Sequence, residues 1–594
     1  MRQHLRAIRV LTAFGFRAAP WQAALLLVCA LVMESSGLVI AVGMKLLADA
    51  AVALSLRDGL VAVLVIVLPL GLGVLAAWYF IDLLFTVAER TSALIDKHVM
   101  VLTAGIAGLE HHERPDYLDE LALLHRQRLG LAFFTNTTVS LLRTAVLLVG
   151  SALLLARIHP LLLLLPLFGV GSFLAGRQAN VISQRAAEAT AERSRLRKHL
   201  FGLATSADVG KEVRVFGLST ELLSRHHALT DTIMRDLNRA EWQSAALNAA
   251  GALSIASGYV GAITLVLIRA VQGLATPGDV LLAAGLAAQM SGIVFLAVAH
   301  GTELLNRLRV ARRLLWLTDY AARVRPQSAD PAPVPTALTR GIQIQDLSFR
   351  YPGTDSEVLK NIALDIPAGS VVALVGENGA GKTTLVKMLC RFYEPDSGQI
   401  TADGVDLHRF EVGAWRTRLS TGFQDFCRFE FLARETVGVG DLPNLDHIPA
   451  MEAALMRAGA DDVPEALPAG LETQLGRDWE GGVDLSGGQW QKLALGRAFM
   501  REDPLLVILD EPTAAIDAQT EHALFERIAT EAHRDERQGT VTLLISHRFS
   551  TVRMADHIVV LDKGQIIEQG THSDLMDNDK LYAELYRLQS RAYQ

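Results

Sequence analysis

Residues Gly376–Thr383 read GENGAGKT and fit the pattern GxxxxGK[ST]. The apolar run Val371–Val375 precedes this loop, and apolar residues recur at helical spacing after it, so the pattern sits in a strand–loop–helix. Glycines let backbone N–H groups face phosphate oxygens, and the helix N-terminus favours negative charge. Lys382 would neutralise the β- and γ-phosphates, and the Thr383 hydroxyl would ligate Mg²⁺. The predicted nucleotide-binding loop comprises Gly376, Glu377, Asn378, Gly379, Ala380, Gly381, Lys382, Thr383 and Thr384.

Two consecutive carboxylates follow a second apolar run, Leu505–Leu509. A strand that ends in Asp510 would place its carboxylate beside the phosphate loop, where it can hold Mg²⁺ through water. Glu511 would then polarise the attacking water. A solvated loop position is the alternative for Glu511, and the motifs that follow below argue against it.

These loops require an α/β domain. The continuous apolar runs 371–375, 505–509 and 541–545 are typical of central parallel strands covered on both faces, and residues 342–350 favour an antiparallel portion. Residues 323–340 are rich in Pro and Ala and predict a linker. We therefore expect a C-terminal α/β P-loop domain over residues 341–594.

The first half, residues 1–322, predicts a polytopic α-helical membrane domain whose helices extend into the cytoplasm. Six segments approach or exceed the ~20 apolar residues that cross a bilayer. They are predicted near residues 20–44, 59–84, 135–156, 160–177, 245–270 and 279–300. Two pieces between the cytoplasmic extensions, Leu109–Leu118 and Val209–Leu218, are predicted to cross over as short interruptions.

Basic residues set the predicted orientation in the cell membrane. Arg and Lys are frequent in segments 1–19, 85–132 and 177–244, and sparse in the opposite loops, so the N-terminus and the C-terminal domain are expected in the cytoplasm. A cleaved signal peptide over residues 1–35 is the competing interpretation. It is disfavoured because no clean cleavage site follows and its removal would leave five spans.

Composition excludes several classes of protein. Hydrophobic residues make up 51% and charged residues 20%, and mean hydropathy is +0.28, which excludes a disordered or fibrous chain and argues against a purely soluble one. Residues 1–339 hold 31 basic and 23 acidic side chains, whereas residues 340–594 hold 25 and 40. The acidic second half offers no basic footprint for nucleic acid. Three cysteines are too few for a disulfide framework or a zinc site.

Some ionisable residues fall inside or near the spans. Glu34, Asp82 and Arg143 are costly in lipid, so each should face a cavity, a partner or the interface. Substrate pathway, structural pair and snorkelling all stay open for them. The adjacent His111 and His112 are expected in a solvated or interface-facing turn rather than at a metal.

A further motif decides the resemblance. Leu485–Gln489 reads LSGGQ, and Ser546-His547 follows the apolar run 541–545. Together with the phosphate loop and the LLVILDEPT strand, LSGGQ resembles the nucleotide-binding domain of ABC ATPases. Six preceding spans make the chain similar to an ABC half-transporter of the exporter fold, and KEVRVFGL is similar to a branch that includes bacterial peptide and lantibiotic exporters.

The resemblance implies roles for matching residues. Tyr351 would stack on adenine, Gln424 would sense Mg²⁺, and Asp517 would be the D-loop aspartate. His547 would contact the γ-phosphate as the switch histidine. Ser486 and Gly488, with Gln489 of the same motif, belong to the ATP site of the other subunit. The crossing pieces resemble coupling helices. The expected ligands are ATP and Mg²⁺, the metal held by Thr383, Gln424 and Asp510, and Glu511 and His547 are the expected catalytic residues.

LSGGQ completes a site begun by another chain, so the resemblance implies a dimer. A homodimer is favoured because Glu511, His547 and LSGGQ lie in one chain, and a heterodimer stays open. The expected activity is ATP-driven export of an amphipathic or hydrophobic peptide, lipid or drug across the membrane by alternating access. An importer or an ATP-gated regulator on the same fold is the alternative. A soluble ABC ATPase of DNA repair or translation is disfavoured by the six spans.

Overall fold

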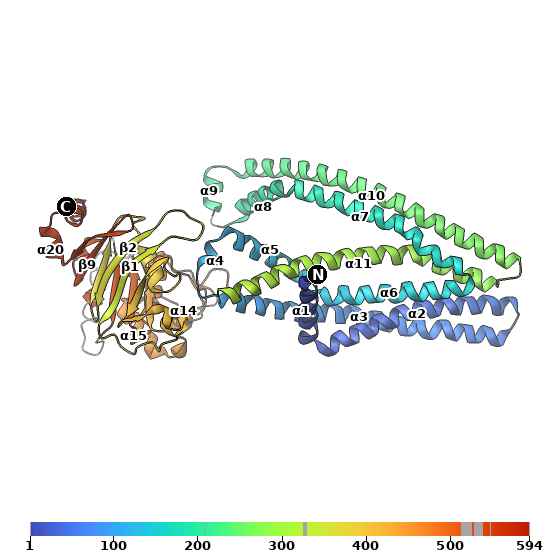
Figure 1. Ribbon diagram of the computed structural model, residues 1–594, viewed down its shortest axis with the longest axis horizontal. Coiled ribbons are helices and arrows are strands. Elements are labelled where there is room, and N and C mark those ends of the chain that lie inside the picture. Colours follow the sequence, from blue (N-terminus) through green and yellow to red (C-terminus); the bar gives the residue numbers. More distant parts are fainter. Residues whose placement is uncertain are drawn as a thin grey trace. The chain divides into compact units, whose positions relative to one another are not determined.

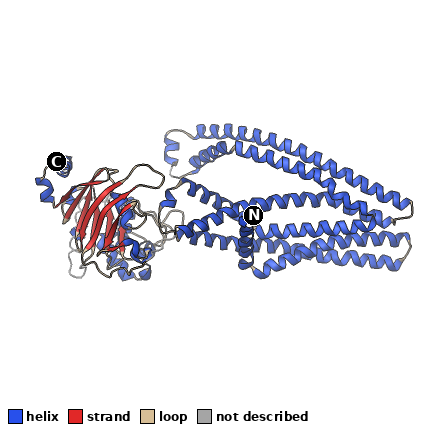
Figure 2. Cartoon of the chain, in the orientation of Figure 1, coloured by secondary structure: helices blue, strands red, loops and turns tan. Residues whose placement is uncertain are grey.

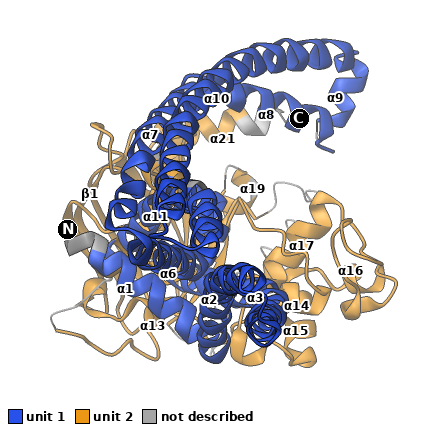
Figure 3. Ribbon diagram, turned by 90° about the vertical axis from the view of Figure 1, so that its right-hand side faces the viewer, with its two compact units in different colours: residues 1–103, 120–319 blue, residues 104–119, 320–594 orange. Residues whose placement is uncertain are grey.

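The structure, a computed structural model, describes residues 2–207, 209–324, 330–512, 526–527, 539–546 and 548–592. The chain forms two compact units (Figure 3). The helical unit comprises residues 1–103 and 120–319, and the α/β unit comprises residues 104–119 and 320–594. The short piece 104–119 therefore belongs to the α/β unit, although in sequence it lies between two membrane segments.

Long helices dominate the first half of the chain (Figure 1). They are α2 (Pro20–Val52), α3 (Leu56–Ala104), α6 (Phe134–Ile158), η1 (Pro160–Leu164) with α7 (Leu165–Ala189), α10 (Ser219–Val271) and α11 (Pro277–Arg323). Among the described residues, six helices are long and apolar enough to cross a membrane, and each contains one predicted span. The predicted six-helix membrane domain is confirmed.

Three of these helices are far longer than a bilayer requires. Helices α3, α10 and α11 contain 49, 53 and 47 residues, against about 20 for the hydrocarbon layer, so the predicted extensions exist. Shorter helices complete this half: α1 (Arg2–Ala18), α4 (Glu110–Glu113), α5 (Pro115–Ala132), α8 (Ala191–Thr205) and α9 (Gly210–Val215). Helices α4 and α9 fall within the two predicted crossing pieces. Helix α1 was not predicted.

Helices α7 and α10 run side by side because small residues let them approach (Figure 1). A Cβ at Gly251 would lie 2.8 Å from Ser172 Cα, and one at Gly258 would lie 2.7 Å from the Phe168 ring. The Ser254 hydroxyl donates to the Phe168 carbonyl at 2.8 Å. Small and polar residues therefore form the contact between the two helices.

Ionisable residues within the spans pair with each other. Arg143 Nε on α6 lies 3.0 Å from Glu34 Oε1 on α2, and both side chains are largely buried. The Arg143 guanidinium also lies 5.7 Å from the centroid of the Phe80 ring. Of the roles left open, the structural pair is the one observed. Asp82 is exposed on α3.

The strands all belong to the α/β unit and form two sheets (Figure 2). The first has the order β2-β1-β4-β5 and is antiparallel: β1 (Gly341–Phe349), β2 (Leu359–Pro367), β4 (Ser397–Ala402) and β5 (Val405–Asp406). The second has the order β10-β9-β3-β8-β7-β6, with β10 as the antiparallel edge: β3 (Val371–Val375), β6 (Leu419–Gly422), β7 (Leu506–Asp510), β8 (Val541–Ile545), β9 (His557–Asp562) and β10 (Gln565–Gly570).

Strands β3, β7 and β8 are buried at every position, as their continuous apolar runs predict. Because β3 and β7 both pair in parallel with β8, their C-terminal ends meet at one edge of the sheet. The phosphate loop and the Asp510–Glu511 pair therefore converge.

The described helices of the α/β unit that follow the linker are α12 (Lys382–Leu389), α13 (Val412–Arg416), α14 (Ala433–Gly438), α15 (Ile448–Ala458), α16 (Asp462–Glu465), α17 (Gly487–Ala498), α19 (Phe549–Val552), α20 (His572–Asp577) and α21 (Leu581–Ala592).

Candidate functional site

The loop between β3 and α12 depends on glycine geometry. Gly376, Gly379 and Gly381 adopt φ values of +155°, +85° and +106°, which favour glycine. Gly381 is the residue that precedes α12, so its left-handed backbone starts the helix. A Cβ on Gly376 would collide with the Leu561 carbonyl oxygen of β9, because the loop passes close to that strand. The loop is therefore held in one shape by the sheet beside it.

Lys382 is the first residue of α12, and its side chain is buried against the loop. Its Nζ donates hydrogen bonds to the carbonyl oxygens of Gly376 and Glu377, at 2.8 and 2.9 Å. Burial lowers the pKa of Lys382, and the negative charges of Glu511 and Asp510 oppose that shift. A cation held inside a ring of backbone amides is suited to phosphate oxygens.

Four polar residues stand opposite the lysine. The Thr383 hydroxyl donates to Asp510 Oδ2 at 3.3 Å, which places two oxygen ligands of the kind Mg²⁺ prefers side by side. Asp510 is buried, and that burial raises the pKa of its carboxyl group. Gln424 Nε2 donates to Glu511 Oε2 at 2.8 Å. Glu511 adopts φ +45°, an uncommon conformation for a residue with a side chain, and such strain clusters at functional sites.

These groups surround one cavity of about 650 Å³. Its lining includes most of the predicted phosphate and metal residues, together with Val358: Asn378, Gly379, Gly381, Lys382, Thr383, Thr384, Gln424, Asp510 and Glu511. Gly376 and Glu377 contribute carbonyl groups to Lys382 from behind the cavity, and Ala380 is a buried residue of the same loop. The donor set fits a triphosphate with one divalent cation.

Comparison with known proteins agrees with this geometry. Residues 359–514 match the ABC transporter family model. An ATP-dependent lipid A-core flippase of Chromohalobacter salexigens is 33% identical over 359 residues, covering 60% of this chain and 59% of the relative. The flippase of Escherichia coli K12 is 39% identical over 252 residues, 42% of this chain and 41% of the relative. The matched parts thus span less than two thirds of these relatives.

The fold has a solved counterpart along nearly the whole chain. A bacterial Atm1-family ABC exporter with ATP bound superposes with a TM-score of 0.70 at 24% identity, covering 96% of this chain and 98% of that one. This chain has an ABC domain and the exporter fold. It is a multi-pass membrane protein, and its ABC domain uses ATP.

The LSGGQ motif of the ABC domain does not line its own phosphate cavity. Ser486 is exposed and precedes α17, where its Oγ accepts from the Gln489 backbone N–H at 3.3 Å. The Gln489 side chain accepts from the Ser486 N–H at 3.0 Å. This reciprocal capping box is what starts the helix. The Gln489 side chain, assigned to ATP from the motif, is thus engaged at the start of its own helix.

Three further residues were assigned roles from the resemblance, and the structure describes one of them. Tyr351 lies beside α12, the helix that follows the phosphate loop, and its hydroxyl forms a hydrogen bond with the Thr384 hydroxyl at 3.0 Å. Lys387 Nζ lies 5.0 Å from the centroid of the Tyr351 ring. The predicted residues His547 and Asp517 lie outside the described residues.

The piece 104–119 attaches to the ABC domain at several points. The Leu109 N–H donates to the Phe392 carbonyl at 3.1 Å, and an Arg416 N–H donates to the Ala107 carbonyl at 2.6 Å. Lys387 Nζ on α12 lies 2.8 Å from Glu113 Oε1 on α4. Motif analysis missed Lys387 and Glu113 because neither belongs to a contiguous pattern.

His111 on α4 is not solvated. It is buried, with ring centroids 5.0 Å from Tyr117 and 6.5 Å from Tyr320. Burial, with His112 beside it, lowers the pKa of His111 to about 4. The expectation was a solvated or interface-facing turn: the exposure of His112 agrees with it, whereas the buried His111 is not solvated. Within the described residues, no group of three or more His, Cys, Asp or Glu side chains could hold a metal ion.

Proposed function

We propose that this chain hydrolyses ATP and uses the energy to export an amphipathic or hydrophobic compound, such as a peptide, lipid or drug, across the cell membrane. One observation carries the proposal: Lys382, Thr383, Asp510, Gln424 and Glu511 surround a single cavity in an ABC domain joined to six membrane-crossing helices. The names of the flippase and exporter relatives support the same class of activity.

Each residue has a role that follows from its place. Lys382 and the loop N–H groups bind the β- and γ-phosphates, and the buried lysine meets their charge without competing water. Thr383 and Asp510, with the Gln424 amide oxygen after rotation of that side chain, would hold Mg²⁺. The metal would neutralise charge on the β- and γ-phosphates. Glu511 then orients and polarises water toward the γ-phosphate, and its contact with Gln424 links the base to the metal residues.

A dimer is part of the proposal. The Ser486–Gly488 end of α17 is exposed and absent from the lining of its own cavity, as a motif that completes another subunit's site would be. Backbone N–H groups at this helix start, with the Ser486 hydroxyl, would contact the γ-phosphate of ATP bound by the partner. We favour a homodimer because this chain carries both halves of such a site. Tyr351 stacked on adenine and His547 on the γ-phosphate belong to the same proposal.

Closure of this dimer would change the cavity between the membrane helices. The distribution of basic residues supports a cytoplasmic position for the N-terminus and the ABC domain. ATP binding would bring the two ABC domains together, and the segment around α4, held to its ABC domain by Glu113 and Leu109, would move with it. ATP binding thus shifts the population between inward- and outward-facing states, and hydrolysis resets it.

The decisive experiment is ATP hydrolysis by the purified chain in lipid nanodiscs, beside Glu511→Gln. The expected result is Mg²⁺-dependent hydrolysis that falls by about 100-fold or more in the variant, while ATP binding persists, because only the general base is lost. Cargo uptake into inside-out vesicles then measures direction. Hydrolysis that survives Glu511→Gln contradicts the role of this residue, and cargo that leaves the vesicle lumen contradicts export.

A further inference from the structure

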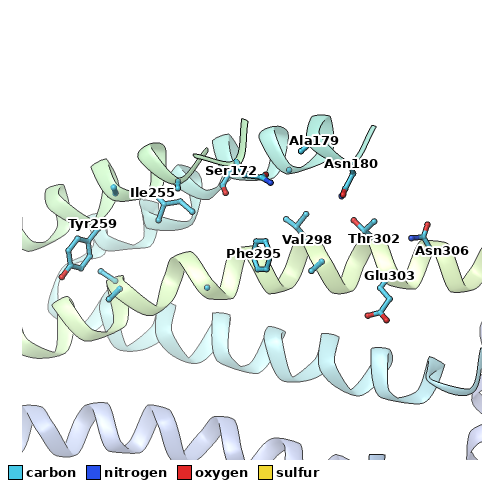
Figure 4. A pocket seen from close by; sticks show the side chains of 18 residues that line it. Ser172, Ala179, Asn180, Ile255, Tyr259, Phe295, Val298, Thr302, Glu303 and Asn306 are labelled. Carbon is cyan, nitrogen blue, oxygen red and sulfur yellow. The ribbon is translucent and has the colours of Figure 1, made fainter. Parts of the chain in front are cut away.

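The helical unit contains a cavity of about 990 Å³ between α7, α10 and α11 (Figure 4). This volume is at the upper end of the range for small-molecule sites, about 300–1,000 Å³. The lining is divided along the helices. Tyr259 and Ile255 lie toward one end, Phe295 lies near the middle, and Asn180, Thr302 and Asn306 lie toward the other end (Figure 4).

The polar end of the cavity carries four uncharged polar side chains, those of Asn180, Asn248, Thr302 and Asn306. Asn180 on α7 points toward Thr302 on α11 (Figure 4). In the described part of the chain, the side chains of Asn180, Asn248, Thr302 and Asn306 make no hydrogen bond to another residue. Each carboxamide offers two N–H donors and one acceptor oxygen, and the hydroxyl offers both functions. Such groups facing a cavity are suited to ligand hydroxyl or amide groups.

The depth of these residues matches the two parts of an amphipathic molecule. Measured from the connection between α10 and α11 at 1.5 Å per residue, Tyr259 lies about 18 Å and Phe295 about 27 Å along its helix. Thr302 and Asn306 lie about 37 and 44 Å along α11. A hydrocarbon layer about 30 Å thick therefore contains the apolar end of the cavity and leaves Thr302 and Asn306 beyond its far edge.

Charge narrows the class of ligand. Among the described residues, the lining includes no Lys or Arg, and its one acid is Glu303. The Glu303 carboxylate is paired with Arg307, also lies 3.8 Å from His300 Nδ1, and points away from α7 (Figure 4). These lining residues offer no cation to pair with an anionic head group. Their one acid, Glu303, already pairs with Arg307 and so is not available to a cationic head group. Burying an unpaired charge is costly, so both are disfavoured.

From these observations we infer that the cavity binds the transported molecule, and that this molecule has an apolar chain or ring and an uncharged polar part carrying hydroxyl or amide groups. This inference rests on the proposed function and specifies its cargo. Carboxamides of Asn180, Asn248 and Asn306 with the Thr302 hydroxyl bind the polar part. Tyr259, Ile255 and Phe295 pack against the apolar part.

Three probes with the same twelve-carbon chain separate the alternatives: dodecanoyl-N-methylglucamide is uncharged, dodecyl phosphate is anionic, and dodecyltrimethylammonium is cationic. Binding of each radiolabelled probe to the full chain in nanodiscs is measured after subtraction of binding to empty nanodiscs. The expected result is saturable binding of the glucamide at least 10-fold tighter than that of either charged probe.

Variants locate that binding. Asn180→Leu and Thr302→Val are expected to weaken glucamide binding 5-fold or more and to reduce its stimulation of ATP hydrolysis. The matched controls are Gln178→Leu on the exposed side of α7 and Thr264→Val on α10, neither of which lines the cavity. They should leave binding and basal hydrolysis unchanged. Equal or tighter binding of a charged probe, or lining variants that behave like their controls, overturns the inference. Since binding is read without ATP, failure of the proposed ATPase would be seen separately in basal hydrolysis.

Discussion

Lys387 and Glu113 form an ion pair at 2.8 Å although 274 positions separate them in the chain. Glu113 ends α4, the short helix that follows α3, and Lys387 lies on the helix that starts at the phosphate loop. The Lys387 ammonium also lies 5.0 and 5.6 Å from the ring centroids of Tyr351 and Tyr393. One cation therefore connects α4 to the tyrosine that the ABC resemblance assigns to adenine.

The first prediction tests this connection. Glu113→Gln and Lys387→Met should each weaken ATP binding 2- to 5-fold, since loss of a partly exposed pair is worth about 0.5–1 kcal/mol. The double variant should be no weaker than the worse single variant, because the two residues act through one contact. The ATP affinities of the parent protein, the two single variants and the double variant form a double-mutant cycle. Asp579→Asn, which breaks a surface pair with Arg587, is the control and should bind ATP normally. Additive effects would contradict the link.

The second prediction concerns the Glu34–Arg143 pair. Removing one partner by Glu34→Gln or Arg143→Leu leaves a charge in the helical unit without its partner, which costs about 3–5 kcal/mol for a buried pair. Each variant should therefore lower the melting temperature of the purified protein. Exchange of the two residues, Glu34→Arg with Arg143→Glu, should recover at least half of the loss. No recovery would mean that the arginine acts mainly through Phe80, over whose ring it lies.

The third prediction is a pH dependence of stability. His111 in the folded protein has a pKa of about 4, below the usual 6.5, so between these values the unfolded chain binds a proton that the folded chain does not. Stability is complete above pH 6.5 and falls as pH drops toward 4, by about 2 kcal/mol at pH 5 from this residue. The melting temperature from pH 7 to pH 5 measures the slope.

His111→Phe should flatten that slope, because phenylalanine can occupy the aromatic site between Tyr117 and Tyr320 without titrating. His112→Phe is the matched control: His112 is exposed, so the slope should match that of the parent protein. A slope that is the same in the parent and in His111→Phe would assign the pH dependence to other groups.

The fourth prediction distinguishes two loop glycines. Gly376→Ala should abolish measurable ATP binding, because the new Cβ would collide with the Leu561 carbonyl oxygen and force the loop away from β9. In Gly379→Ala the new Cβ has open space around it, so the only cost is that of the left-handed backbone, about 1 kcal/mol. ATP binding should therefore weaken about 5-fold. Equilibrium ATP binding to each variant provides the measurement. Equal losses would show that backbone conformation alone governs both positions.

Much of the ATP site was predictable because it lies in contiguous patterns. The loop 376–384 and the Asp510–Glu511 pair each follow a fully apolar strand, and parallel pairing of such strands brings their ends to one edge. The six membrane helices were predictable for a similar reason. A run of about 20 apolar residues is long enough to cross a bilayer, and within lipid it must form a helix to satisfy its backbone hydrogen bonds. Helix α1 escaped because its apolar residues are interrupted by arginines and form no continuous run.

Pairs between distant residues could not be predicted. Glu113 does not differ in type or local context from other acids of the chain, and the position of Glu34 inside a span predicts that it needs a partner or a cavity without saying which. Only folding brings the two acids to Lys387 and Arg143. The same holds for Gln489, whose motif predicts an ATP contact while its side chain caps α17. It holds also for His111, which a charged local sequence suggests is solvated. The physical reason is range: strand, helix and loop geometry depend on neighbours within a few residues, whereas burial, ion pairing and the lining of a cavity depend on which surfaces meet after the chain has folded.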